Sequence, residues 1–256
     1  MSRPTDKFKT LEKSYPCDHL SHRARVRIGL VQLATDYTLE NDWHQLVGDE
    51  VELYSTRMPY SSEINPTVLR SMENDIGTAA ALVAPGQELD VMAYGCTAAS
   101  MLIGDAQIAA QLTQQRPGLP ATNPWNACKA ALHHLQAKRI AVLTPYTSDV
   151  NLPLFEALEQ EGFNVAAFGA FQLTKDTEIP SVHPTSIEAA VKDLLANTQV
   201  DAVFLSCTNL RAMQILDKLE QQFGLPMVSS NQAMFWHALR LADSQLTFTG
   251  FGRLLA

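Results

Sequence analysis

An internal repeat constrains the fold of this chain more than any other feature of its sequence. Three pairs of segments match in the same order at nearly one offset. They are DVMAYGCT at 90–97 with DAVFLSCT at 201–208, RIGLV at 27–31 with RIAVL at 139–143, and LP at 119–120 with LP at 225–226. The first pair aligns Cys96 with Cys207 at an offset of 111 residues. The repeat predicts a duplicated domain of about 110 residues, which is a common domain size.

Each half alternates strand-like runs with helix-like segments. The apolar runs are 26–33, 51–54, 91–94, 140–143, 165–168, 202–205 and 226–228. The amphipathic segments are 65–84, 126–136, 152–160, 186–196, 210–223 and a last helix at 231–241. This alternation is typical of βαβ units and parallel sheets. We therefore expect an α/β fold of two similar Rossmann-like domains, related by a pseudo-two-fold duplication, with the active site in the interdomain cleft.

The domain boundaries follow from the repeat. We expect a leader at 1–24, a first α/β domain at 25–122 together with 230–256, and a second α/β domain at 123–229. The leader is polar and lacks the apolar block of a secretory signal, and no stretch approaches the roughly 20 apolar residues that span a bilayer. These features predict a cytoplasmic protein with no membrane partner.

The charge and the motifs narrow the classes of partner. A formal net charge of -8 argues against nucleic acid or anionic lipid as the main partner. A small anion is still a suitable substrate, because the amides of a helix N-terminus bind anions even on an acidic protein. The four cysteines include no CxxC pair, and the chain has neither a P-loop nor a G-x-G-x-x-G pattern. We therefore expect no metal and no cofactor.

Cys96 and Cys207 each follow a strand and precede a helix-like segment. Ligands of parallel α/β sheets bind at the carboxyl ends of the strands. Amides at a helix N-terminus lower the pKa of a thiol and also bind carboxylates. Thr97, Thr208 and Asn209 add hydroxyl and amide groups beside the thiols. The pattern predicts thiol chemistry on a small carboxylate substrate.

The pairing of the cysteines is what favours a functional interpretation. A single cysteine at a strand end is more often a small buried packing residue. Cys17 and Cys128 have no counterpart in the other half, whereas Cys96 and Cys207 match. Two thiols across a cleft suit removal of a proton from one face of a carbon and delivery to the other, with one thiol starting as thiolate. They also suit addition of one thiolate to an activated double bond.

The motifs YGCTAAS at 94–100 and LSCTNLR at 205–211 resemble those of the aspartate/glutamate racemase superfamily. The resemblance extends from about Arg25 to Asp243. It is closest to the branch that contains maleate cis-trans isomerases, arylmalonate decarboxylases and ectoine-utilisation relatives. It implies two Rossmann-like domains without a cofactor, and a homodimer as the expected assembly.

The relatives imply distinct roles for the two thiols. Racemases of the superfamily use them as acid and base. Maleate isomerases add the first thiolate to the alkene, which makes Cys96 the expected nucleophile and Cys207 the expected proton donor. Arylmalonate decarboxylases keep only the second cysteine, so the presence of Cys96 argues against decarboxylation.

The same resemblance implies substrate-binding residues outside the cysteine segments. The loop at 33–40 matches a loop that binds a substrate carboxylate, which makes Thr35 and Asp36 candidates. Asp36 stands where maleate isomerases usually have asparagine, and its carboxylate would repel a second substrate carboxylate. An amino or hydroxy acid is therefore favoured over maleate. Tyr146 matches a tyrosine that contacts substrate and is expected to donate to a carboxylate or enolate oxygen, unless it only packs at a strand end.

Three functions stay open from the sequence. The leading one is a cofactor-independent isomerase, either a racemase or a cis-trans isomerase, acting on a small carboxylate. A bilobed ligand-binding protein without catalysis would share the duplicated fold but would not need two thiols. A decarboxylase that uses Cys207 alone would keep its activity without Cys96.

Overall fold

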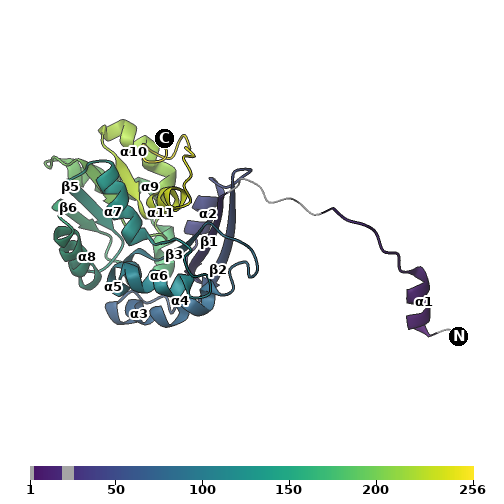
Figure 1. The fold of residues 1–256 in the computed structure, drawn as a ribbon. Helices are drawn as coiled ribbons and strands as arrows, with labels where there is room; N and C mark the ends of the chain where they lie inside the picture. The colour runs from purple at the N-terminus through teal and green to yellow at the C-terminus, as the bar shows by residue number, and fades with distance from the viewer. Residues whose placement is uncertain (1–2, 19–25) are drawn as a thin grey trace.

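The computed structural model describes residues 3–18 and 26–256, and its body consists of two parallel four-stranded sheets (Figure 1). The first sheet has the order β2-β1-β3-β4 and the second the order β6-β5-β7-β8. The strands are β1 (Val26–Leu33), β2 (Val51–Met58), β3 (Val91–Gly95), β4 (Ala121–Thr122), β5 (Arg139–Thr144), β6 (Asn164–Ala170), β7 (Ala202–Leu205) and β8 (Met227–Ser229). Both sheets have the same topology, so the predicted duplicated α/β fold is confirmed.

The helices alternate with the strands as βαβ units require. In the first half they are α2 (Leu39–His44), α3 (Pro66–Ser71), α4 (Glu73–Ala80), α5 (Thr97–Ile103) and α6 (Asp105–Thr113). In the second half they are α7 (Pro124–His134), α8 (Ser148–Gln160), η1 (Asp176–Ser181), α9 (Pro184–Leu195), η2 (Met213–Ile215), α10 (Leu216–Phe223) and α11 (Ser230–Leu241). Helices α3, α7 and α9 begin with proline, which has no amide hydrogen to leave unpaired at the first position. Each is also capped by the side chain of the residue before the proline.

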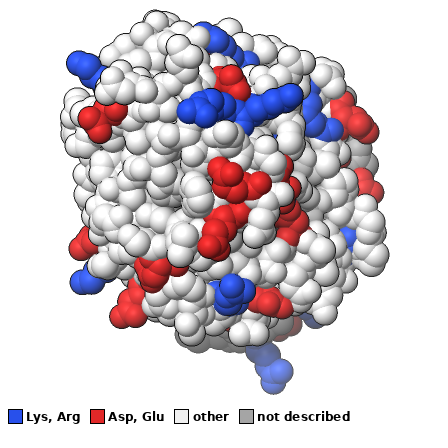
Figure 2. All heavy atoms as spheres, turned by 90° about the vertical axis from the view of Figure 1, so that its left-hand side faces the viewer, with Lys and Arg blue, Asp and Glu red and all other residues white. Residues whose placement is uncertain are grey.

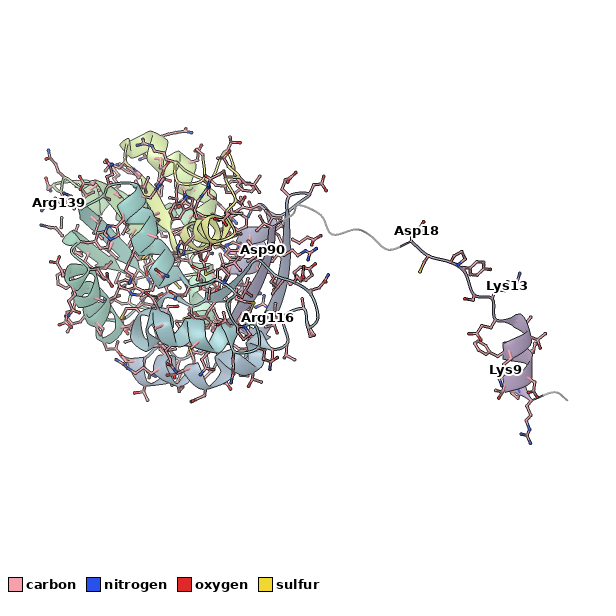
Figure 3. All side chains as sticks on the ribbon, viewed as in Figure 1. Lys9, Lys13, Asp18, Asp90, Arg116 and Arg139 are labelled. Carbon is pink, nitrogen blue, oxygen red and sulfur yellow. The ribbon has the colours of Figure 1, made fainter. Side chains whose placement is uncertain are left out.

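A repeated contact explains why the two halves share an Arg and an Asp. The amide of Arg27 donates to Asp90 Oδ2 at 2.6 Å, and the amide of Arg139 donates to Asp201 Oδ2 at 2.7 Å. Each aspartate precedes the third strand of its half and caps the start of the neighbouring first strand. Asp90 and Arg139 mark these equivalent places in Figure 3. The repeated residues therefore fix the register between the two central strands of each sheet.

Two helix predictions are wrong in detail. The segment 65–84 forms two helices, α3 and α4, separated by Met72, which keeps helical dihedral angles. The segment 210–223 is α-helical only in α10, its last eight residues. Its first part forms turns and η2, because Leu210 and Met213 are buried there and Arg211 Nε donates to the carbonyl oxygen of Pro180. Tertiary contacts of this segment outweigh its helical pattern.

The last helix connects the two halves. α11 follows β8 and packs against α7, and it also contacts β3, β4 and α2 of the first half (Figure 1). Trp43 of α2 meets Phe235 of α11 edge-to-face at 5.3 Å between ring centroids. α11 thus packs against elements of both halves, and the assignment of 230–256 to the first domain stays a prediction. The boundary of the leader at residue 24 lies outside the described residues.

The described part of the leader is exposed throughout. Residues 3–18 contain α1 (Pro4–Leu11), none of whose side chains is buried. Lys9, Lys13 and Asp18 lie along this segment, apart from the body, in Figure 3. On the face of the body shown in Figure 2, acidic and basic side chains form separate small groups within a mainly uncharged surface. None of the described helices is long and apolar enough to cross a membrane.

The close packing of β3 against α2 gives a test of this fold. A Cβ on Gly95 would clash with Cδ2 of the buried Leu39. We expect Gly95→Ala to destabilise the protein by about 1–3 kcal/mol through overpacking. Urea denaturation measures this change, and Gly48→Ala is the matched control because a Cβ there meets nothing within 4 Å. Equal denaturation midpoints for the two variants would contradict the packing described.

Candidate active site

Cys96 lies between β3 and α5. It is the residue before the first turn of α5, with φ −155° and ψ 112°, and its carbonyl oxygen accepts a hydrogen bond of 2.6 Å from Ser100 Oγ. The preceding Gly95 allows the close approach of Leu39. Cys96 is 7% exposed, so its thiol is nearly enclosed by protein.

Cys207 occupies the equivalent place after β7, in a different backbone conformation. Its φ is 119°, in the region that favours glycine. Such strain costs on the order of 1–3 kcal/mol and persists only where surrounding contacts hold it. One of these contacts is the hydrogen bond of 3.0 Å from the Cys207 amide to Ser230 Oγ. Strain of this kind clusters at functional sites, which singles out Cys207 from the other cysteines.

Ser230 connects the two cysteine segments. Its Oγ accepts from the Cys207 amide and, at 2.8 Å, from Thr97 Oγ1, the residue after Cys96. Ser230 is the first residue of α11 and is fully buried. The structure thus brings together two segments that are 111 residues apart in the sequence.

Two tyrosines lie within electrostatic reach of both thiols. Burial raises the pKa of Tyr146, and the thiolates of Cys207 and Cys96 would raise it further. The Tyr146 side chain in turn lowers the pKa of Cys207, which places its hydroxyl against that thiol. Burial also raises the pKa of Tyr60, with Cys96, Asp176 and Cys207 as further causes. Tyr146 is therefore packed at the strand end and also directed at Cys207. The packing hypothesis and the substrate-contact hypothesis for this tyrosine are thus compatible.

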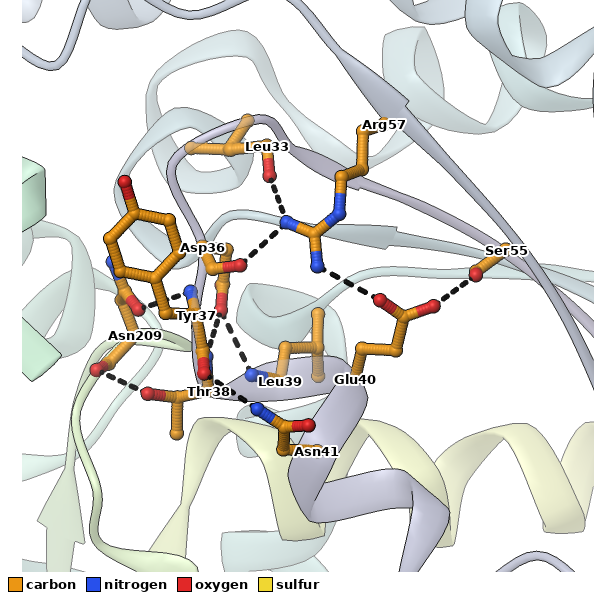
Figure 4. A network of polar contacts seen from close by, with 10 residues as sticks. All are labelled: Leu33, Asp36, Tyr37, Thr38, Leu39, Glu40, Asn41, Ser55, Arg57 and Asn209. Atoms are coloured by element: carbon orange, nitrogen blue, oxygen red, sulfur yellow. Dashed lines mark hydrogen bonds and ion pairs between the residues drawn. The ribbon is translucent and has the colours of Figure 1, made fainter.

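The loop after β1 is held by main-chain contacts (Figure 4). Asp36 Oδ1 accepts from the amides of Thr38 and Leu39, both at 2.9 Å, and so caps the start of α2. Arg57 Nη1 donates to the carbonyl oxygens of Leu33 and Asp36 at 3.1 and 2.6 Å. Burial raises the pKa of Asp36, while the two amides and the Thr208 side chain lower it. One oxygen of Asp36 is therefore used to hold the loop rather than a ligand.

Asn209 fastens this loop to the second half. Its Nδ2 donates to the carbonyl oxygens of Thr35 and Asp176 at 3.0 and 3.1 Å, and its Oδ1 accepts from the Tyr37 amide at 2.9 Å. Its carbonyl oxygen accepts from Thr38 Oγ1 at 2.9 Å. Asn209 is 1% exposed. The predicted residue is thus part of the site region, and all four of these hydrogen bonds are to protein.

A second buried network lies behind Thr208. Asn231 Nδ2 donates to Asp42 Oδ2 and to the Thr208 carbonyl oxygen, both at 2.8 Å, and the Asn231 carbonyl oxygen accepts from Trp43 Nε1 at 3.0 Å. Burial raises the pKa of Asp42 to about 7, against the hydrogen bond from Asn231; Asp36 raises it further and Arg211 lowers it. This network joins α2, α11 and the segment after Cys207.

The structure gathers all eight residues that the sequence singled out, and adds three that it did not. The eight are Cys96, Cys207, Thr35, Asp36, Thr97, Tyr146, Thr208 and Asn209. Asp176, Tyr60 and Ser230 were missed. Ser230 follows β8, so the rule that ligands bind at carboxyl ends of strands could have indicated it. Asp176 begins η1 and Tyr60 lies in the loop after β2, neither of them within a sequence motif, and only folding brings them to the thiols.

The predicted low pKa of the thiols is wrong for the unliganded protein. Burial raises the pKa of Cys96 to about 12, although the amides of Ala99 and Ala98 lower it and Asp176 and Asp36 raise it. Burial and Asp176 raise the pKa of Cys207 well above its ordinary value, against Tyr146 and the Asn209 amide. Loss of water around the thiol outweighs the amides. Both thiols are protonated in this state.

The acidic and sulfur-bearing groups of the site do not form a metal centre. Across residues 3–18 and 26–256, no group of three or more His, Cys, Asp or Glu side chains is arranged to hold a metal ion. The groups available to a ligand are hydroxyls, amides, thiols and two carboxyls. These groups suit binding of a small polar molecule and transfer of its protons.

Comparisons with known proteins agree with this architecture. Residues 61–255 match the arylmalonate decarboxylase family model. The maleate isomerase of Nocardia farcinica is 27% identical over 90% of this chain and 95% of its own length. The arylmalonate decarboxylase of Bordetella bronchiseptica is 32% identical over 55% of this chain and 60% of its own length. A structure of a mutant Nocardia farcinica maleate cis-trans isomerase with a covalently bound succinylcysteine intermediate has a TM-score of 0.82, at 27% identity over 90% of this chain and 98% of that one.

The duplicated parallel sheets and the paired cysteine segments define an α/β enzyme of the maleate isomerase and arylmalonate decarboxylase group. The chain belongs to the arylmalonate decarboxylase family. The family resemblance and the enzyme class expected from the sequence are confirmed. The roles of the individual site residues are treated below.

Burial of the thiols predicts a low reactivity without ligand. With iodoacetamide at pH 7.5, we expect the exposed Cys17 to react first and Cys96 and Cys207 to react at least about tenfold more slowly, because only a small fraction of each is thiolate. Peptide mass spectrometry gives the rate at each cysteine. In urea all four should react alike. Faster labelling of Cys96 or Cys207 than of Cys17 in the folded protein would contradict the enclosed site.

The raised pKa of Asp42 predicts how the free energy of unfolding depends on pH. Its folded pKa of about 7 lies above the ordinary 3.8, so the stability contributed by its protonated form is fully present below pH 3.8 and is lost as the pH rises through 7. We expect Asp42→Asn to be more stable than the parent by about 1–3 kcal/mol at pH 8 and to match it near pH 4. Urea denaturation across this range measures the difference. Asp75→Asn, at an exposed site, is the control, and a parallel pH profile for Asp42→Asn and the parent would refute the assignment.

Proposed function

We propose that this protein is a cofactor-independent isomerase that uses Cys96 and Cys207 on a small carboxylate. The observation that carries the proposal is the equivalent placement of the two cysteines after the third strands of two duplicated sheets, with Ser230 linking their segments. The similarity to maleate isomerases, one of them with a succinylcysteine intermediate, supports thiol chemistry of this kind.

Two reactions balance with this pair of thiols. In proton transfer at one carbon, one thiolate removes the proton and the opposite thiol supplies another, so the two thiols exchange protonation states. In reversible addition, the Cys96 sulfur bonds to one alkene carbon and the Cys207 thiol protonates the other. Rotation about the resulting single bond and the reverse steps give the isomer. In both routes the starting thiolate forms by transfer of one thiol proton to water.

The surrounding groups suit these steps. The amides of Ala98 and Ala99 lower the pKa of Cys96, and the Tyr146 side chain lowers that of Cys207. They stabilise the thiolates once these form. Thr97 and Thr208 lie next to the thiols along the chain. Thr97 donates its hydroxyl hydrogen to Ser230 Oγ, so we assign Thr208 and Tyr146 to donate to the substrate carboxylate and Thr97 to hold the segment beside Cys96.

Thr35, Asp36 and Asn209 complete the proposed binding region. Thr35 and Asn209 hold the carboxyl group of Asp176, and Asp36 lies beside Thr208. Two carboxyl groups in one enclosed site disfavour a second carboxylate on the substrate. This supports an amino or hydroxy acid as the substrate. The cytoplasmic location and the homodimer expected from the sequence stay predictions.

Decarboxylation by Cys207 alone is the second candidate. The match of residues 61–255 to the arylmalonate decarboxylase family and the 32% identity to the Bordetella bronchiseptica enzyme favour it. The presence of Cys96 within electrostatic reach of Tyr146 favours isomerisation. The contribution of each cysteine to catalysis therefore has to be measured separately.

Single cysteine variants test the proposal. We expect Cys96→Ser and Cys207→Ser each to lower kcat for isomerisation by about 100-fold or more, because each removes one partner of an acid–base or nucleophile pair. Single enantiomers of amino and hydroxy acids, maleate and arylmalonates are the substrates, followed by nuclear magnetic resonance in deuterium oxide. Cys128→Ser is the control, since Cys128 is buried in α7 and its thiol donates a hydrogen bond to the Trp125 carbonyl oxygen.

The outcomes separate the candidates. Deuterium at the reacting carbon with change of configuration identifies proton transfer, and conversion between cis and trans alkenes identifies addition. Release of carbon dioxide from an arylmalonate with full activity in Cys96→Ser identifies decarboxylation by Cys207. Isomerisation that survives in both serine variants would overturn the two-cysteine mechanism.

A further inference from the structure

Asp176 is a buried carboxyl within electrostatic reach of both thiols, and the proposed reaction steps do not use it. We propose that Asp176 is a specificity-determining residue whose free carboxylate oxygen accepts a hydrogen bond from an ammonium group of the substrate. This inference rests on the proposed function, because it names the chemical class that the same site takes: an α-amino acid in preference to a molecule with a second carboxylate at that place.

The main chain of Asp176 is fixed by the opposite half of the molecule. Its amide donates to the Ser62 carbonyl oxygen at 2.8 Å, and the Ile64 amide donates to the Thr174 carbonyl oxygen at 3.0 Å. Between them Glu63 and Lys175 form an antiparallel bridge. The residue therefore stands where the loop after β2 meets the loop after β6, at the junction of the two halves.

The side chain of Asp176 has one oxygen occupied and one free. Oδ2 accepts from Thr35 Oγ1 at 2.5 Å and from Asn209 Nδ2 at 3.2 Å. Within the part of the chain that the structure describes, Oδ1 accepts no hydrogen bond. The residue is 6% exposed. Among the described residues, the fully enclosed carboxylate oxygens without a partner are Asp36 Oδ2 and Asp42 Oδ1, and Asp176 Oδ1 is not one of them. Asp176 Oδ1 is therefore an acceptor that a ligand with a donor can reach.

Both thiols lie within electrostatic reach of this carboxyl group. Asp176 raises the pKa of Cys96, of Cys207 and of Tyr60. A group bound to Asp176 is therefore close to the place where the thiols act. This position suits the substituent next to the reacting carbon of an amino acid.

Among the described residues, the Asp176 carboxyl forms no ion pair with a cation. Asp36 is the other carboxyl that acts on Asp176, and it disfavours ionisation of Asp176, while Arg57 lowers the pKa of Asp36 itself. Among the described residues no Lys or Arg forms an ion pair with either group, since Arg57 binds the Asp36 carbonyl oxygen and pairs with Glu40. Burial, with Asp36, raises the pKa of Asp176 to about 7, against Thr35 and Asn209. A ligand cation supplies the missing positive charge, and a second carboxylate adds repulsion.

Asp176 carries this role better than Asp36. Oδ1 of Asp36 accepts from the amides of Thr38 and Leu39. Its other oxygen, Oδ2, has no hydrogen-bond partner among the described residues but is fully enclosed, so it is less accessible to a ligand than Asp176 Oδ1. In Asp36→Asn the side-chain oxygen still accepts from the amides of Thr38 and Leu39. In Asp176→Asn the side-chain oxygen still accepts from Thr35 and Asn209, but the negative charge is lost. The two aspartates can therefore be separated by the same substitution.

Matched ligand pairs test the proposal. Alanine and methylmalonate, and phenylglycine and phenylmalonate, differ in carrying an ammonium or a carboxylate on the same carbon. We expect the parent protein to bind the ammonium member of a pair at least about tenfold more tightly at pH 8, measured by calorimetry. Asp176→Asn should lose that preference by about tenfold or more, and Asp36→Asn should lose less of it than Asp176→Asn.

The pH dependence of binding gives an independent measurement. Affinity of the parent for the ammonium ligand should rise about tenfold from pH 6 to pH 8, as Asp176 loses its proton, with Asp36, Tyr60 and the two thiols as the other titratable groups facing it. Asp176→Asn should show a flat profile. A denaturation midpoint near that of the parent establishes that the variant is folded.

The results distinguish this inference from the proposed function. Any of four results overturns the role of Asp176. They are an unchanged preference in Asp176→Asn, a loss of preference in Asp36→Asn as large as that in Asp176→Asn, tighter binding of the malonates by the parent, and no binding of either amino acid at about 10 mM. A preference that depends on Asp176, together with isomerisation unaffected in both cysteine-to-serine variants, upholds the role of Asp176 and overturns the two-cysteine mechanism.

Discussion

The hydrogen bonds of Asn209 hold the carboxyl ends of the two sheets against each other, and the geometry of the site depends on them. Its amide group binds main-chain atoms of the loop after β1 and of the start of η1. Ser230 makes a second link, between Thr97 and the Cys207 amide. Buried polar groups left without such partners cost about 1–3 kcal/mol each. The segments around the thiols are therefore held by protein contacts before any ligand binds.

Burial decides the protonation of the site. A helix N-terminus favours a thiolate, yet the pKa of Cys96 rises to about 12 because its sulfur has lost water. Burial also raises the pKa of Asp42 and of Asp176 to about 7. A resting site that keeps its protons presents neutral thiols to an incoming carboxylate. This arrangement lets an anion enter a region that would repel it if every acidic group were ionised.

The duplicated fold gives two cysteines that are equivalent in topology and different in conformation. Cys96 has an ordinary extended backbone, whereas Cys207 has a φ of 119° and is held by Ser230. Gly95 before the first thiol admits Leu39, and Ser206 stands before the second. The two sheets share one topology because of the duplication. The different backbone conformations at Cys96 and Cys207 suit different roles for the two thiols, one as nucleophile or base and the other as proton donor.

The sequence by itself determined the repeat, the strand positions and the pairing of Cys96 with Cys207, because periodicity and segment matches are local patterns that survive without coordinates. Only the tertiary structure decided that Asp176, Tyr60 and Ser230 join them, since these residues come from loops and a helix start far apart in the chain. It also decided the thiol pKa, which depends on how much water the fold excludes. The prediction of a continuous helix at 210–223 is wrong because of tertiary contacts. Burial of Leu210 and Met213 outweighs the helical pattern of the sequence.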